Sequence, residues 1–230
     1  MLIVAIPKSA STSLMFTLAK LQHLSAEQLG YHDLNTPYEF RNLSAHHDDI
    51  VNLTRGVAKK ISNLNCIYKQ HFPPTTNNIE LLTQQKTVLL LRKPTQVLDA
   101  YYRAIKAFSK EDPVGFERSL GREGWLTYIS ESGLEREIKL FYQGWVELVH
   151  ENVWVVHFKD LISNPITTIN DIENFWGLPV TPGPFSLMKM RYTRNPLHTA
   201  KRKLGIWTRK LNVHDEIIQL LTKIGFYKWR

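Results

Sequence analysis

The sequence contains one cysteine, Cys66, so no disulfide can form within the chain. No set of Cys and His residues has the spacing of a zinc site, and we expect no bound metal. The apolar run before Pro7 is too short for a signal-peptide core, and no later run is long enough to span a membrane. Repeats, low-complexity tracts and linker-like stretches are also absent. We therefore expect a protein of the reducing cytoplasm without a transmembrane segment.

The composition fits one α/β domain and an anionic partner. With 230 residues and 43% hydrophobic content, the chain can bury an ample core, and we expect residues 1–230 to form a single domain. The formal net charge of +8 favours a negatively charged ligand. A nucleotide with several phosphate or sulfate groups, a nucleic acid and an acidic glycan all meet this condition, so charge alone does not choose among them.

The chain is organised around its first residues, which predict a strand, a turn and a helix. Residues 2–6 form a short apolar run typical of a strand buried on both faces, and leucines at helical spacing predict a helix over 12–23. A strand that turns sharply into a helix leaves backbone N–H groups unpaired, and these groups bind phosphate oxygens together with the helix dipole. The turn is thus a candidate phosphate-binding loop.

The side chains of this loop also suit an anion. Lys8 adds a mobile positive charge, while Ser11, Thr12 and Ser13 supply hydroxyl groups that either cap the helix or bind the anion. The loop has none of the glycines that a Walker A loop requires, which argues against an ATPase or a kinase.

The loop resembles the 5′-phosphosulfate loop of sulfotransferases that use 3′-phosphoadenosine 5′-phosphosulfate (PAPS). That family usually has Pro-Lys-Ser-Gly-Thr-Thr, and this chain has Pro-Lys-Ser-Ala-Ser-Thr. The resemblance implies that the donor nucleotide is held by the loop residues Lys8, Ser9, Ala10, Ser11, Thr12 and Ser13. Ala10 replaces the family's glycine, and its methyl group fits beside the phosphate only if Ala10 keeps a negative φ.

A second strand, predicted over 65–70, is followed directly by His71. Ligands of open parallel sheets bind at the carboxyl ends of the strands, so His71 should lie near the loop if both strands share a sheet. Alternatively, His71 has a structural role only and forms its hydrogen bonds with loop carbonyls. The pattern Lys-x-His-x-Pro resembles the segment of cytosolic sulfotransferases that holds the general base. It implies that His71 takes the acceptor proton, while Lys8 stabilises the leaving phosphate and Lys69 assists at the sulfuryl oxygens.

A third strand, predicted over 86–91, leads through Arg92 into a helix. The segment resembles the family's 3′-phosphate motif, Arg-x-Pro-x-x-Val-x-x-Ser-Tyr-Tyr. The resemblance implies that Arg92 binds the 3′-phosphate, for which its forked donors are suited. Ala100 replaces the serine of the motif, so the serine contacts cannot be carried over. We interpret Tyr101 and Tyr102 as core and helix-packing residues.

The rest of the chain predicts further elements of the same domain. They are a short helix from Ser25 to Gly30, short helices and loops over 31–65, a loop with a short helix over 109–134, a helix over 134–149, a strand over 153–158, a helix that Asn164 caps and Gly177 ends, and a last helix over 212–225. The strand over 153–158 ends at Phe158, where the family has a tyrosine beside the adenine. Stacking on the adenine would survive this change, whereas the phenolic hydrogen bond would not.

A basic run precedes the last helix and consists of Lys201, Arg202 and Lys203. It resembles the basic, glycine-containing loop with which sulfotransferases cover the 3′-phosphate, although Leu204 interrupts the usual Arg-Lys-Gly triplet. A solvated basic surface is the alternative interpretation.

The resemblance implies a three-layer α/β domain whose central parallel sheet has about four to five strands, the P-loop-type fold of sulfotransferases. It also implies transfer of a sulfuryl group from PAPS to a hydroxyl or amine of a small molecule, lipid or sugar, without metal or nucleic acid. Two alternatives are a kinase-like phosphotransferase, for which Asp160 would have to bind magnesium, and a basic module that binds nucleotide, nucleic acid or glycan without catalysis.

Overall fold

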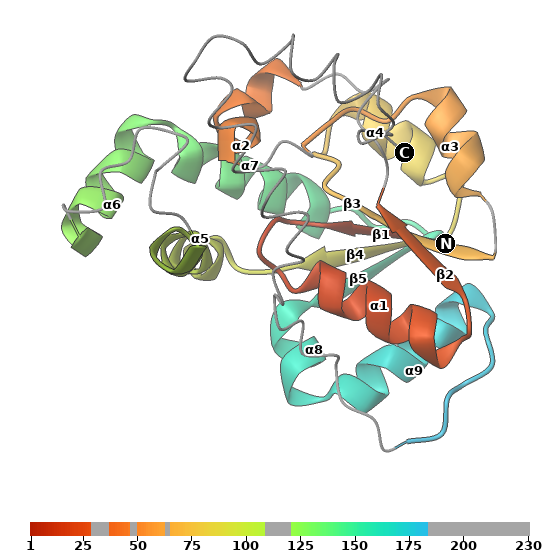
Figure 1. Cartoon of the computed structure of the whole chain (residues 1–230). Coiled ribbons are helices and arrows are strands. Elements are labelled where there is room, and N and C mark those ends of the chain that lie inside the picture. The colour runs from red at the N-terminus through yellow and green to blue at the C-terminus, as the bar shows by residue number, and fades with distance from the viewer. Residues whose placement is uncertain (29–36, 47–49, 63–64, 109–120, 184–230) are drawn as a thin grey trace, which may run out of the picture. The chain divides into compact units, whose positions relative to one another are not determined.

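The computed structural model describes residues 1–28, 37–46, 50–62, 65–108 and 121–183 (Figure 1). All of them belong to one compact unit that spans Met1–Met188. The predictions for the basic run at 201–203 and for the last helix therefore lie outside the described residues.

Five parallel strands form one sheet in the order β2-β3-β1-β4-β5 (Figure 1). Their bounds are β1 Leu2–Ala5, β2 Ser25–Gln28, β3 Cys66–Gln70, β4 Thr87–Leu91 and β5 Val153–His157. The three inner strands are buried throughout, as expected for strands with a neighbour on each side and helices on both faces. The predicted α/β fold with a parallel sheet is confirmed.

Helices cover both faces of the sheet. One face carries α1 Ser11–Leu21, α8 Phe158–Ser163 and α9 Pro165–Trp176, which lie together below the sheet in Figure 1. The other face carries η1 Tyr38–Phe40, α2 Arg41–His46, α3 Arg55–Ile61, α4 Thr76–Leu82, α5 Pro94–Phe108, α6 Gly121–Glu131 and α7 Leu134–Val146. Side chains of β1 alternate between the two cores: Leu2 and Val4 enter one and Ile3 and Ala5 enter the other.

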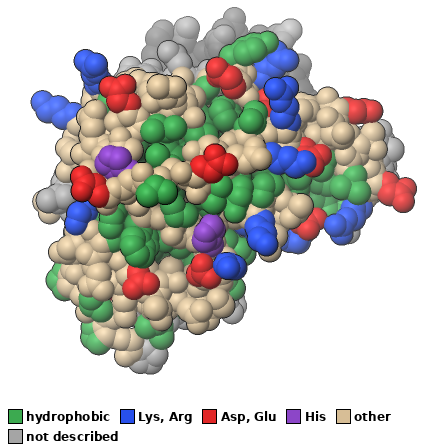
Figure 2. All heavy atoms as spheres, turned by 180° about the vertical axis from the view of Figure 1, so that it is seen from behind, with side chains coloured by type: hydrophobic (Ala, Val, Ile, Leu, Met, Phe, Trp, Pro, Cys, Tyr) green, Lys and Arg blue, Asp and Glu red, His purple; other side chains and the backbone are tan. Residues whose placement is uncertain are grey.

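The edge strand β5 is less buried than the inner strands, and its Trp154 is 43% exposed beside Phe175, with ring centroids 5.9 Å apart. The face opposite to that of Figure 1 mixes hydrophobic side chains with charges of both signs (Figure 2). Basic side chains on that face are interspersed with acidic ones, so they form no continuous basic stripe there.

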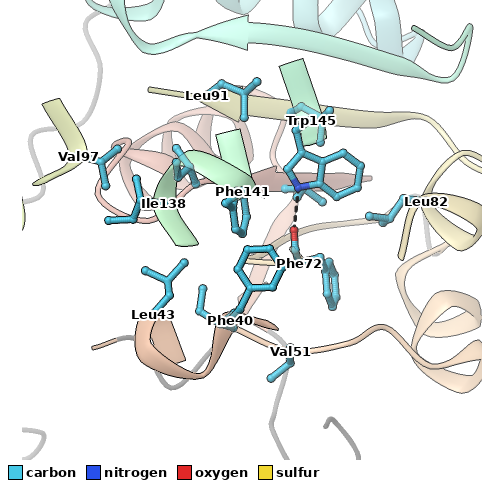
Figure 3. Packing of buried hydrophobic residues seen from close by; sticks show 14 of the residues in the cluster. Phe40, Leu43, Val51, Phe72, Leu82, Leu91, Val97, Ile138, Phe141 and Trp145 are labelled. Atoms are coloured by element: carbon cyan, nitrogen blue, oxygen red, sulfur yellow. Dashed lines mark hydrogen bonds between the residues drawn. The ribbon is translucent and has the colours of Figure 1, made fainter. Parts of the chain in front are cut away.

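The core above β1 fixes the segment that follows β3. Trp145 of α7 is fully buried, and its Nε1–H donates to the backbone carbonyl of Phe72 at 3.0 Å (Figure 3). Phe141, one turn earlier, meets Phe40 edge to face with ring centroids 6.0 Å apart. Burying each such side chain contributes roughly 1.5–3 kcal/mol. The predicted helix over 134–149 is thus confirmed as α7, and it holds the chain next to His71.

The prediction of a helix at Ser25 is wrong, because Ser25–Gln28 is the edge strand β2. Its residues pair with β3, from Ser25 opposite Cys66 to Gln28 opposite Lys69. The Ser25 hydroxyl donates to the carbonyl of Asn65 at 3.0 Å instead of accepting a helical N–H. Backbone pairing with a neighbouring strand has outweighed the local capping signal.

Other predicted helix boundaries hold, with one difference in detail. Pro94 and Pro165 begin α5 and α9, and Gly177 ends α9 with a φ of 73°. Asn164 occupies the position before α9, but its side chain caps no helical N–H and donates to the Ser163 hydroxyl at 3.3 Å. None of the helices within the described ranges is long and apolar enough to cross a membrane.

Candidate active site

The sheet brings the predicted site residues to one edge. Strands β1 and β4 are neighbours, and the helices that follow them, α1 and α5, cover opposite faces of the sheet (Figure 1). Ligands of open α/β sheets bind outside the carboxyl ends of strands at such a point. The loop with Lys8 follows β1, Arg92 follows β4, and His71 follows β3 on the other side of β1.

Two residues of the loop have left-handed backbone, with φ values of 61° at Lys8 and 68° at Ala10. Ala10 therefore does not meet the condition under which its methyl group was expected to fit beside a phosphate, which was a negative φ. Ala10 lies directly before α1, and the left-handed conformation turns the chain from the strand into the helix within a few residues. This conformation costs a residue with a Cβ about 1–2 kcal/mol. The loop is thus strained at two positions, on either side of Ser9.

The strained loop presents donors that suit an anion. The first hydrogen bond of α1 runs from the N–H of Leu14 to the carbonyl of Ala10 at 3.1 Å, so the N–H groups of residues 11–13 have no partner within the helix. Ala10 also supplies no side-chain cap. Left-handed and turn conformations direct successive N–H groups into concave nests that bind phosphate. The Ser9 hydroxyl is fully buried and has no hydrogen-bond partner in the described part of the chain.

The imidazole of His71 is held against β1. Its Nδ1 lies 2.6 Å from the carbonyl oxygen of Ala5, the last residue of β1, and the residue is 2% exposed. Because a carbonyl only accepts, Nδ1 must carry the proton, and the neutral ring then has its lone pair at Nε2. Nε2 is the atom that could take a proton from a substrate. A backbone carbonyl thus binds Nδ1 of His71, as the alternative interpretation had it. The same hydrogen bond fixes the tautomer that a general base needs.

Arg92 links three parts of the site. Its Nη1 donates to the backbone carbonyl of Lys8 at 2.6 Å, and its Cζ lies 4.0 Å from the ring centroid of Phe158, the first residue of α8. The buried Nε has no hydrogen-bond partner among the residues described. Burial lowers the pKa of the guanidinium below its usual value, and nearby Arg103 lowers it further while Asp99 raises it. An arginine stays charged under such a shift.

The other predicted residues lie in the interior or on the helices nearby. Lys69 is 3% exposed within β3, where strand alternation places it on the same face as Ile67, toward α1. Ser11 is buried at the start of α1, whereas Thr12 and Ser13 are half-buried. The structure thus gathers the loop, His71, Arg92 and Phe158 at one edge, with Lys69 inside the adjoining strand. Ala100 is half-buried in α5, directly before Tyr101.

Two contacts, one at the site and one between α7 and α2, were not foreseen from the sequence. The ammonium of Lys8 lies 5.3 Å from the ring centroid of Tyr101, a core residue that is 2% exposed. Glu137 of α7 is buried and accepts hydrogen bonds from the side chain of Asn42 at 2.7 Å and from the N–H of Leu43 at 2.6 Å. An acidic residue within the apolar stripe of a helix is a sequence signal for such a buried anchor. The contact with Tyr101 has no comparable signal.

Two shallow hollows lie away from these residues. One, of about 430 Å³, lies between α3 and α4, and the other, of about 390 Å³, lies beside α6 and α7. Their walls consist mostly of long polar side chains and include no predicted site residue. Within the described ranges, no three His, Cys, Asp or Glu residues are grouped to hold a metal ion. The donors at the carboxyl edge of the sheet are therefore the best candidate site.

Comparison with known families identifies the class of this protein. The sulfotransferase domain family matches residues 1–205, so the chain belongs to that family. The resemblance seen in the motifs is thereby confirmed, and with it the general assignment to sulfotransfer. A search among curated proteins finds no match.

Several solved structures are similar to this chain at low sequence identity. A sulfotransferase from Alicyclobacillus acidocaldarius has 12% identity and a TM-score of 0.48, with 95% of this chain and 94% of that chain covered. A mouse sulfotransferase complexed with PAP has 11% identity and a TM-score of 0.49, with 78% and 58% covered. A shikimate kinase from Bacteroides thetaiotaomicron has 12% identity and a TM-score of 0.42, with 77% and 97% covered.

Proposed function

We propose that this protein transfers a sulfuryl group from PAPS to a hydroxyl or amine of a small molecule, lipid or sugar. The observation that carries the proposal is the hydrogen bond between His71 Nδ1 and the carbonyl of Ala5. It gives a neutral imidazole the tautomer of a general base beside the strand from which the phosphate loop leaves. Membership of the sulfotransferase family supports the same reaction.

The donor would be held at two points by this chain. The N–H groups of residues 11–13, the Ser9 hydroxyl and the ammonium of Lys8 suit the 5′-phosphosulfate. Arg92 suits the 3′-phosphate, because its Nη1 already fixes the loop while its buried Nε is still available as a donor among the described groups. One face of the Phe158 ring carries this guanidinium, so the adenine would stack on the other face. The basic run at 201–203 stays a prediction for the same phosphate.

PAPS supplies an activated sulfuryl group, and the residues of the site supply proton transfer and charge stabilisation. Nε2 of His71 takes the proton of the acceptor as the acceptor oxygen or nitrogen bonds to sulfur. The bond between sulfur and the bridging phosphate oxygen breaks, and its electron pair stays on that oxygen. Lys8 and the loop N–H groups stabilise this negative charge, as cationic donors do in phosphoryl transfer. Lys69, which is 3% exposed, would assist only at oxygens bound against the end of β3.

The test compares His71→Ala with wild type in transfer and in binding. With labelled PAPS and a panel of phenol, sterol, lipid and sugar acceptors, the variant should lose about 10²- to 10⁴-fold in rate. It should still be stabilised against heat by adenosine 3′,5′-bisphosphate, since His71 does not hold the donor. Transfer by His71→Ala at the wild-type rate would refute the base assignment. His150→Ala, at an exposed histidine after α7, is the matched control and should behave like wild type.

The same thermal-shift measurement separates the alternative functions. At a concentration 100 times its dissociation constant, a ligand stabilises its protein by about 2.7 kcal/mol. A shift with the bisphosphate and none with ATP and magnesium supports the sulfotransferase, whereas the reverse result supports a kinase. Nucleic-acid binding that falls steeply with salt, without a bisphosphate shift, would support the basic binding module.

A further inference from the structure

Lys8 is held at both ends by the segment that follows β4. Its backbone carbonyl accepts a hydrogen bond from Arg92 Nη1 at 2.6 Å, and its ammonium lies 5.3 Å from the ring centroid of Tyr101. Both partners are buried or half-buried, and both belong to the stretch formed by the end of β4 and α5. The loop and this stretch follow neighbouring strands, so the contacts cross the point where a ligand of the sheet would bind.

The Tyr101 ring is a fixed support. It is 2% exposed and belongs to the core cluster above β1, together with Val97 and Leu98 of the same helix. The residue before it, Ala100, has no hydroxyl that could hold the ammonium. A lysine side chain has several rotatable bonds, and fixing it beforehand lowers the entropy lost when it binds an anion. An aromatic face attracts an ammonium without using up all of its N–H donors.

We propose that Tyr101 is a positioning residue for Lys8. Its ring keeps the ammonium at the mouth of the phosphate loop before the donor binds, while Arg92 keeps the left-handed backbone of Lys8 in place. The role of Lys8 toward the donor rests on the proposed function, whereas the contact between ammonium and ring does not. The two parts are therefore tested separately.

The contact is tested by NMR of the protein with ¹³C-dimethylated lysines, which keep their positive charge. The Lys8 methyl signal, assigned through its loss in Lys8→Arg, should be shifted upfield by the ring current of Tyr101. Tyr101→Phe keeps the ring and should keep the shift, whereas Tyr101→Leu should abolish it. A Lys8 signal that is the same in wild type and Tyr101→Leu overturns the contact. If Tyr101→Leu does not fold, Tyr101→Met takes its place, because the longer, flexible methionine side chain adapts better to the shape that the ring leaves.

The consequence for the donor is tested by a double-mutant cycle with Lys8→Met, read as calorimetric affinity for adenosine 3′,5′-bisphosphate. Tyr101→Leu should weaken binding about two- to fivefold when Lys8 is present, which corresponds to the lower end of the range for cation–π contacts. It should change nothing in the Lys8→Met background. An equal loss in both backgrounds, or tighter binding in the first, overturns the proposal, because a structural defect does not depend on Lys8.

Tyr102→Leu is the matched control, because Tyr102 packs beside Trp125, with ring centroids 6.2 Å apart, on the same helix. Its effect on affinity should be equal with and without Lys8. If wild-type protein does not bind the bisphosphate at all, the proposed function and the positioning role toward the donor both fail. The NMR comparison still decides in that case whether Tyr101 holds Lys8.

Discussion

Among the described residues, left-handed backbone occurs in the phosphate loop and at four positions near helix ends, where three glycines and His23, which follows α1, adopt it. The loop contrasts with two of these glycine boundaries. Gly133 before α7 has a φ of 75° and Gly177 after α9 has a φ of 73°. The loop has Lys8 at 61° and Ala10 at 68°. Glycine adopts this conformation freely, whereas other residues pay about 1–2 kcal/mol. The backbone at Gly133 and Gly177 is therefore unstrained, whereas the loop is strained at the place where donors converge.

The largest effect should come from Lys8→Gly, which relaxes the backbone and removes the ammonium. Transfer should fall by about 10²–10³-fold, as when one charge-stabilising donor is removed from an active site. Lys8→Met should lose as much activity, because it also lacks the charge. The glycine variant should nevertheless be roughly 1 kcal/mol more stable than the methionine variant in urea unfolding. Equal stability of the two variants would mean that the loop is not strained at Lys8.

The second effect concerns the helix that begins after Gly133. Glu137→Ala removes the carboxylate that accepts hydrogen bonds from Asn42 and Leu43 at the start of α2. Three donors then lose a charged partner, and unfolding should become easier by roughly 3 kcal/mol. Glu135→Ala removes a half-buried carboxylate that pairs with Lys139 one turn later, and it should cost only about 0.3–0.5 kcal/mol. Similar losses for both variants would contradict the anchoring role of Glu137.

The third effect compares the two glycines. At Gly177 an added Cβ would meet nothing within 4 Å, so Gly177→Ala should lower the free energy of unfolding only through its left-handed backbone, by about 1 kcal/mol. At Gly133 the Cβ would lie 3.1 Å from Nδ2 of Asn42, which must then move away from Glu137. Gly133→Ala should therefore be the less stable variant in the same urea titration. The opposite order would show that the Asn42 side chain can move aside without losing its hydrogen bond to Glu137.

The sequence carries most of the fold because the inner strands are marked by their own residues. β1 and β4 are short and mostly apolar runs, which is what burial on both faces requires, whereas β3 begins apolar and ends in the buried Lys69 and Gln70. The glycine and prolines at the helix ends restrict the backbone locally. β2 is different, since a strand at the edge of the sheet can be polar, and Ser25–Gln28 shows no apolar alternation. Its structure is decided by pairing with β3, which no local pattern records.

In the site, too, some features could be predicted from local sequence, whereas others depend on contacts between residues far apart in the chain. Lys8, His71 and Arg92 were predicted because each follows a strand, and the order of strands brings them together. The left-handed φ of Ala10 could not be predicted, because alanine prefers the other conformation and the tertiary structure imposes this one. The contact of Lys8 with Tyr101 depends on the packing of α5 against the loop. It could not be predicted, because the two residues are far apart in the sequence and no local pattern relates them.

The smallest effect should come from Ala10→Gly, which tests whether the loop keeps its strain for the sake of function. The substitution relieves a left-handed alanine but adds the backbone entropy of a glycine to the unfolded chain, which leaves a net gain of roughly 0.5–1 kcal/mol. Ala100→Gly, within α5, is the matched control and should lose about 1 kcal/mol, since its helical backbone suits alanine.

The sign of the change at Ala10 decides how the loop differs from the glycine boundaries. If Ala10→Gly is more stable and still binds the bisphosphate as well as wild type, the N–H groups of the loop hold their direction without the methyl group. The strain is then a tolerated cost. If the variant is more stable but binds the bisphosphate more weakly, the methyl group helps to keep the loop rigid before the donor arrives. A less stable Ala10→Gly would show instead that the left-handed alanine is not strained and that this loop and the glycine boundaries are equivalent.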